Sequence, residues 1–194
     1  MTPPTILLQT YRTCVLAVLT LGLALQAAST HAADCTVQLS QSELDYGRIT
    51  RGELAAPTHM QTDLPLHERH VTLTAICASP SAMALFFRAT AVDASRFRLA
   101  DGGSFSINID HALLDGKPVS LGSVRYLGEP PSQIANSLPL RPHFGVQPLI
   151  DGQAAQGTQL SVQLTVKPQI TAATSLRRDE TDLHQQGTFD MVTP

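Results

Sequence analysis

The chain has 194 residues, of which 43% are hydrophobic and 15% are charged, and its formal net charge is −3 at pH 7. This composition excludes a disordered tail and indicates a folded chain of about one domain. Acidic residues outnumber basic ones, so nucleic acid is not expected as a partner.

The first 33 residues are predicted to be a secretory signal peptide. Arg12 precedes an apolar run from Val15 to Leu25, and small residues up to Ala33 complete a cleavage site. The apolar run is too short to form a stable membrane-spanning helix. We therefore expect export through the periplasm and a single folded domain of residues 34–194.

Two cysteines lie outside the predicted leader. Cys35 belongs to a short stretch that alternates apolar and polar side chains, and Cys77 ends a longer one, Arg69–Cys77. Both cysteines fall on the apolar side, so the two strands are predicted to lie side by side with their sulfur atoms facing the core. An oxidising compartment favours a disulfide between Cys35 and Cys77, and the alternative is two free thiols.

The remainder of the chain predicts further strands with period-two alternation. They are, in order, Met83–Thr90, Ser104–Asp110, Pro118–Leu121, Gln159–Val166 and Gly187–Thr193. In the clearest of them, Leu160, Val162, Leu164 and Val166 are predicted to face inward.

Turn residues and polar connections separate these strands. Turns are predicted at Ala78–Ser81, Asp101–Gly103, Asp115–Lys117 and Asp151–Gly152, and at Gly47. Loops or solvated connections are predicted at Thr50–Glu68, Gly128–Pro148 and Lys167–Gln186. Apart from the leader, no window keeps a helical period, so the fold class is predicted to be an all-β sandwich of seven or eight short strands.

No catalytic residues are predicted. A Gly-x-Ser-x-Gly nucleophile motif is absent, and no pair of carboxylates stands in a catalytic context. Three histidines, His59, His67 and His70, do not match a zinc-ligand spacing, so we expect neither a metal nor a cofactor. The sequence thus favours a protein that binds or assembles over an enzyme.

Three stretches, together with the two cysteines, carry a resemblance to a known family. Leu44–Ile49, His70–Leu85 and Gly152–Pro168 are similar to stretches of the pilin subunits of chaperone-usher fimbriae, in the beta-fimbrial branch of proteobacteria. The resemblance implies an immunoglobulin-like sandwich that lacks its last strand. It also implies that a periplasmic chaperone fills the resulting groove, and that the N-terminal extension of another subunit then replaces the chaperone.

That resemblance sets the expected partners and location. The partners would be a periplasmic pilus chaperone, an outer-membrane usher and other fimbrial subunits, with a host-surface ligand as a further contact. The chain would reach the cell surface as a structural or adhesive part of a fimbrium.

The sequence departs from the family pattern at both ends of the domain. After cleavage only one or two residues would precede Cys35, which leaves no donor peptide, so a tip or capping position is expected. The C-terminus lacks the penultimate tyrosine common in pilins, but Phe189 and Met191 alternate and are predicted to lie on the strand that pairs with the chaperone.

Two other classes remain open. A self-contained secreted or periplasmic binding domain would complete its own sandwich, with Lys167–Pro194 supplying the closing strand. A periplasmic enzyme would require a pocket with converging polar groups.

Overall fold

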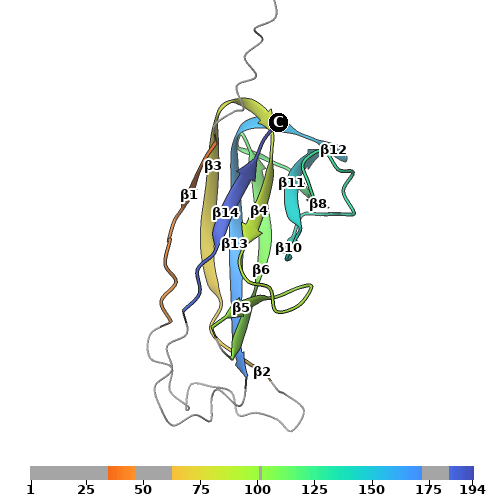
Figure 1. Ribbon diagram of the computed structural model, residues 1–194. Coiled ribbons are helices and arrows are strands. Elements are labelled where there is room, and N and C mark those ends of the chain that lie inside the picture. Colours follow the sequence, from red (N-terminus) through yellow and green to blue (C-terminus); the bar gives the residue numbers. More distant parts are fainter. Residues whose placement is uncertain (1–34, 47–62, 101, 172–183) are drawn as a thin grey trace, which may run out of the picture. The chain divides into compact units, whose positions relative to one another are not determined.

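The computed structural model describes residues 35–46, 63–100, 102–171 and 184–194. Every described residue belongs to one compact unit, Ala33–Pro194. The described residues form fourteen strands and no helix. The strands build two antiparallel sheets, so the all-β sandwich predicted from the sequence is confirmed at that level (Figure 1).

The first sheet contains the longest strands. Its order is β1 (Cys35–Leu39), β3 (Arg69–Ala82), β13 (Gln156–Thr171), β6 (Gly103–Leu114) and β10 (Leu138–Leu140). Three short strands extend it: β2 (Asp63–Pro65) pairs with β13, whereas β5 (Phe97–Leu99) and β7 (Lys117–Pro118) pair with β6.

The second sheet is shorter. Its order is β14 (Thr188–Val192), β4 (Ala84–Arg88), β11 (Gly145–Ile150), β8 (Ser120–Val124) and β9 (Gln133–Ala135), and β12 (Gln153–Ala154) pairs with β11. Met83 alone separates β3 from β4, so the chain passes from one sheet to the other within one residue. The strand count exceeds the seven or eight predicted, because several strands are short extensions.

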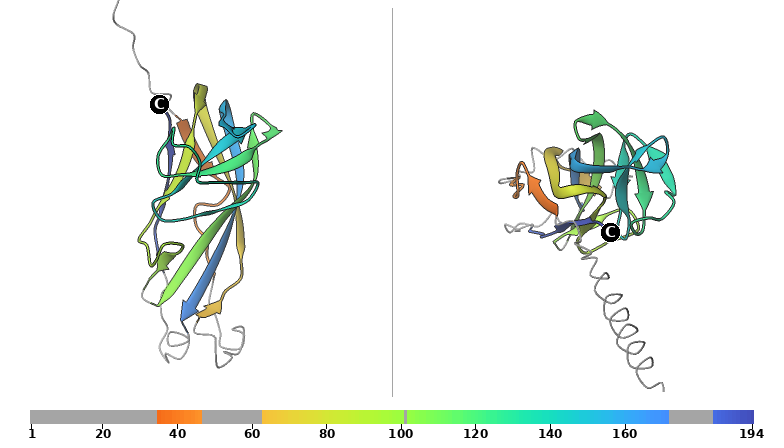
Figure 2. Two further views of the ribbon diagram at one scale, coloured as in Figure 1. Left: turned by 90° about the vertical axis from the view of Figure 1, so that its right-hand side faces the viewer. Right: turned by 90° about the horizontal axis from the view of Figure 1, so that it is seen from above.

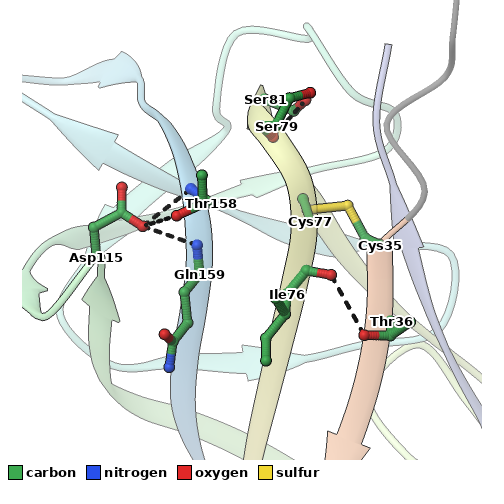
Figure 3. Close-up of a disulfide and its surroundings, with 9 residues drawn as sticks. All are labelled: Cys35, Thr36, Ile76, Cys77, Ser79, Ser81, Asp115, Thr158 and Gln159. Atoms are coloured by element: carbon green, nitrogen blue, oxygen red, sulfur yellow. Dashed lines mark hydrogen bonds between the residues drawn. A yellow bond between two sulfur atoms is a disulfide. The ribbon is translucent and has the colours of Figure 1, made fainter.

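The two cysteine-bearing strands lie as predicted. β1 pairs with β3 in antiparallel register with Cys35 opposite Cys77, and the two sulfur atoms form a disulfide (Figure 3). On β3 the side chains of Val71, Leu73 and Ala75 are buried together with Cys77. The disulfide therefore fastens β1, an end strand, to the interior of the sheet.

The core lies between the facing sides of the two sheets. Leu73 and Leu160 from the first sheet and Leu85 and Leu121 from the second are fully buried. On β13, Leu160, Val162 and Leu164 are buried, as the alternation predicts, whereas Val166 is only partly buried.

The turn predicted at Ala78–Ser81 is wrong, because β3 continues to Ala82. Its ladder with β13 is irregular at this point: Ser81 lies opposite Gly157, but Ile76 lies opposite Gln159. Pro80 falls in this interruption, where its missing N–H costs no ladder hydrogen bond.

The loop predicted at Gly128–Pro148 is also wrong, since it contains β9, β10 and the start of β11. Pro139 is tolerated because β10 pairs only with β6. Pro148 lies past the end of the ladder between β11 and β4, which pairs Gly145 and Val146 alone. The connection predicted from Lys167 is wrong in its first part, because β13 extends to Thr171; residues 172–183 lie outside the described part.

Two Asp-Gly turns are confirmed. Asp115 and Gly116 have φ values of 49° and 77°, and Asp151 and Gly152 have 50° and 77°. Positive φ at both central residues matches the twist of tight hairpins, which explains the Asp-Gly pairs. In the third turn Asp101 lies outside the described residues, but the flanking Leu99 and Gly103 pair as a hairpin requires.

Asp115 also links its hairpin to β13. Its Oδ1 accepts hydrogen bonds from the backbone N–H of Gln159 at 2.8 Å, and from the N–H and hydroxyl of Thr158 at 3.0 and 2.9 Å (Figure 3). The bond from Gln159, followed by the hydroxyl of Thr158, lowers the pKa of Asp115. The carboxylate therefore stabilises the turn in its charged form.

We expect Asp115→Ala to lower the melting temperature of the domain at pH 7 by a few degrees, and Asp115→Asn to lower it by less. Because the folded pKa is lowered, the charge contributes fully above the unfolded carboxyl pKa, about 3.9, and its contribution is lost as the pH falls through the folded pKa. The difference in melting temperature between wild type and Asp115→Asn should thus shrink from pH 7 to pH 3. Both proteins would be measured by thermal unfolding in the soluble form in which wild type is obtained.

Asp151→Asn is the matched control for this experiment. Asp151 holds the same place in the other Asp-Gly turn, but among the described residues none donates a hydrogen bond to its side chain. An equal loss in both variants would contradict the role given to Asp115.

Candidate functional site

β1 and β14 are the end strands on one side of the sandwich, one from each sheet. β1 pairs with β3 and β14 pairs with β4, and no other described strand pairs with either of them. Figure 1 and both views of Figure 2 place them on the same side. Along residues 36–39 and 188–192, each strand therefore has one edge on which the described residues supply no ladder.

The side chains that face the core from these two strands are only partly buried. Val37 and Leu39 on β1, and Phe189 and Met191 on β14, pack against the core but keep contact with solvent, as does Leu44. Two of their partners one strand further in are fully covered: Leu73 lies opposite Leu39, Leu85 lies opposite Met191, and both are 0% exposed. Phe87, opposite Phe189, is itself partly buried. We call β1, β14 and these five partly buried side chains the open edge.

An aromatic cluster holds the β14 side of the open edge. The ring centroid of Phe189 lies 4.7 Å from that of Phe87 on β4. Phe87 in turn contacts Phe97 edge-on at 4.9 Å and Phe105 at 6.0 Å, both from the first sheet. Phe189 thus packs on Phe87, which in turn packs on two rings of the other sheet. Edge-on pairs of this kind add about 0.5–1.5 kcal/mol beyond the burial of their area.

An ion pair fixes β14 to β4 on the outer side. Arg88 donates through its Nε to a carboxylate oxygen of Asp190, and Thr188 lies opposite Arg88 in the ladder. Both side chains contact solvent, so this pair is worth little by itself. Because Asp190 points outward, Phe189 and Met191 on either side of it point toward the core.

The segment after β1 continues along β3. Ser40 Oγ accepts a hydrogen bond from the backbone N–H of Thr72 at 3.0 Å. Arg69 donates to the carbonyl of Asp45 at 3.3 Å, and its guanidinium lies 5.4 Å from the ring centroid of Tyr46. Burial raises the pKa of Tyr46, which the charge of Arg69 partly offsets. The first stretch of the resemblance therefore borders the open edge up to Tyr46, and Gly47 to Ile49 lie outside the described residues.

The described part of the chain brings no three His, Cys, Asp or Glu residues together as a metal site. His70 bonds through its Nδ1 to the hydroxyl of Thr165 at 3.1 Å, which is a scaffold contact. His67 is exposed, and His59 lies outside the described residues.

Sequence reasoning named Phe189 and Met191 but missed the aromatic cluster on which Phe189 packs. Phe87, Phe97 and Phe105 come from three strands of two sheets, so no local pattern joins them. The phenylalanine pair at Phe86 and Phe87 was a usable signal, since one of two adjacent strand residues must face the core.

Comparison with protein-family models and with curated proteins gives no match for this chain. No helix in the described residues is long and apolar enough to cross a membrane.

Proposed function

We propose that this protein is a structural or adhesive subunit of a chaperone-usher fimbria, exported through the periplasm, and that it receives a donated strand at the open edge. The proposed occupants are a periplasmic chaperone first and another fimbrial subunit afterwards. The observation that carries the proposal is the row of core-facing apolar side chains left partly exposed between two end strands.

A donated strand would pair with the backbone of this edge and also cover its partly exposed apolar side chains. Its backbone would hydrogen-bond to the edge of β14 between residues 188 and 192, where no described strand pairs. Alternate side chains of the strand would point inward and cover Val37, Leu39, Phe189 and Met191. Each apolar side chain of the donated strand that passes from solvent into this edge contributes about 1.5–3 kcal/mol, so a strand with several of them would bind tightly.

A tip or capping position follows within this proposal. β1 begins at Cys35, close to the predicted cleavage site after Ala32 or Ala33. A chain cut there would receive a strand without offering one, as only an end position in a fibre allows.

The test is co-purification. Residues 34–194 would be exported to the periplasm with and without a fimbrial chaperone, and the soluble fraction would be analysed by affinity capture of the chaperone and by gel filtration. We expect a one-to-one complex with the chaperone, and aggregation or degradation without it, because the apolar row stays exposed. A stable monomer that ignores the chaperone would contradict the proposal and favour the self-contained binding domain.

A further inference from the structure

A cleft of about 660 Å³ opens beside the aromatic cluster, a volume in the range of small-molecule sites. It is lined by β4 and the segment after it, by the segment after β8, by the segment before β11 and by the end of β14. Phe87 and Phe97 of the aromatic cluster lie at its base, Phe86, Tyr126 and Phe144 add further aromatic surface, and Arg88, Arg125 and His143 are its cationic and polar groups. The cleft touches β14 at Val192, but none of the five partly buried side chains of the open edge lines it.

Strand alternation on β4 places Phe86 on the side that faces away from the core. Because Leu85 and Phe87 face the core, Phe86 between them faces away from it. Its ring lies across Gly145, where an added Cβ would come within 2.7 Å of the ring. Tyr126 is 60% exposed. The guanidinium of Arg141 lies over the ring of Phe144, 4.9 Å from its centroid. A flat ring entering the cleft would therefore meet accessible aromatic side chains.

The charged side chains that line this cleft are two arginines, and each is paired with a carboxylate that does not line it, Asp190 for Arg88 and Glu129 for Arg125. The side chains of Arg88 and Arg125 are 73% and 65% exposed, and no Asp or Glu is among the described residues that line the cleft. Arg88 uses its Nε for Asp190, and Arg125 uses Nε and Nη2 for Glu129. Within the described structure, the terminal nitrogens of Arg88 and Nη1 of Arg125 have no acceptor.

Hydrogen bonds fix the segment after β8, which carries Arg125 and Tyr126. Glu129 accepts the backbone N–H of Arg125 at 2.6 Å and its Nε at 2.8 Å. Its carbonyl accepts from Gln147 of β11 at 3.4 Å, and Gln147 is 2% exposed. The backbone N–H of Ser132 donates a hydrogen bond to the carbonyl of Ser123 at 2.9 Å. The guanidinium is thus positioned before any ligand arrives, which reduces the entropy cost of binding.

We propose that this cleft binds a small ring compound that carries a carboxylate. The ring would lie on Phe86 and Tyr126, and the carboxylate would accept hydrogen bonds from the outward nitrogens of Arg88 and Arg125, a geometry that guanidinium groups favour. A sugar acid and an aromatic acid share this chemistry. The proposal does not depend on the proposed fimbrial function.

The test is isothermal titration of the soluble form of the protein with two pairs of probes. Methyl glucuronide is paired with methyl glucoside, and phenylacetate is paired with phenylacetamide. We expect at least one acid to bind about tenfold more tightly than its neutral counterpart, as a charge-assisted hydrogen bond would give. The pair that shows this preference identifies the source of the ligand.

Two variants locate the binding. Tyr126→Ala removes a ring and Arg125→Gln removes a charge, and each should weaken binding of the preferred acid about tenfold. Ile134→Ala is the control, because Ile134 is 51% exposed on β9 of the same sheet but does not line the cleft. Equal binding of acid and neutral probe, no binding of either acid, or binding that Tyr126→Ala leaves unchanged would each overturn the proposal.

Discussion

The Val37→Lys and Phe189→Lys variants should lose capture by a fimbrial chaperone, whereas wild type retains it. Val37 and Phe189 face the core from the two strands of the open edge, and each is only partly buried. A lysine at either position would place an ammonium group where the inward side chains of a donated strand must pack. Burying that charge without a partner costs several kcal/mol, enough to prevent docking. The measurement is the amount of subunit recovered with an affinity-tagged chaperone.

Each variant has a control one residue away. Gln38→Lys and Thr188→Lys add the same charge to the same strands, but both side chains are exposed and point away from the core. They should leave capture unchanged. Because lysine in a core-facing position can also impair folding, Val37→Thr is added as a milder change of similar shape, and it should give partial capture. Equal loss in core-facing and outward variants would contradict docking at the open edge.

Removing the disulfide is expected to destabilise the domain by about 4 kcal/mol, as the chain-entropy model gives for the 42-residue separation of Cys35 and Cys77. That is a large share of the roughly 5–15 kcal/mol of a typical domain. Cys35→Ser and Cys77→Ser, alone and together, should lower the urea midpoint of the soluble form, or prevent its recovery from the periplasm.

The single and double cysteine variants should have the same effect, because each breaks the same bond. Thr36→Ala is the control, since Thr36 neighbours Cys35 on β1 but is exposed, and its hydroxyl makes only a long bond, 3.5 Å, to the carbonyl of Ile76. A double variant as stable as wild type would show that β1 is held without the disulfide.

The strands that could be predicted from the sequence are those with one face in the core and one in solvent. On β3 and β13 this produces clean alternation, seen at Leu73 and Leu160, whose strand neighbours are largely polar. β11 had no such signal. Five of its six residues are buried, because the segment after β8 covers its outer side; Gln147, for example, is 2% exposed. With both faces covered, and with Pro148 in the run, period-two alternation disappears.

The candidate sites depend on contacts between distant segments. Phe189 and Met191 were predicted because they alternate within one strand. The ring of Phe189, however, packs on Phe87, which in turn packs on Phe105, and no spacing rule joins these three residues. The cleft could not be predicted, because Phe86, Tyr126 and Phe144 meet only once the second sheet has formed. The disulfide was predictable because both cysteines lay on the apolar side of an alternating strand.

The most direct test is backbone hydrogen exchange of the subunit in its chaperone complex and in short labelling pulses begun at its release, before the released subunit aggregates. If a donated strand docks at the open edge, amides of β14 between residues 188 and 192 should exchange slowly in the complex and faster after release. Amides of β9, an end strand on the other side of the second sheet, should exchange equally in both states. Equal protection of β14 in both states, or a change confined to β9, would contradict the claim that this side of the sandwich receives a strand.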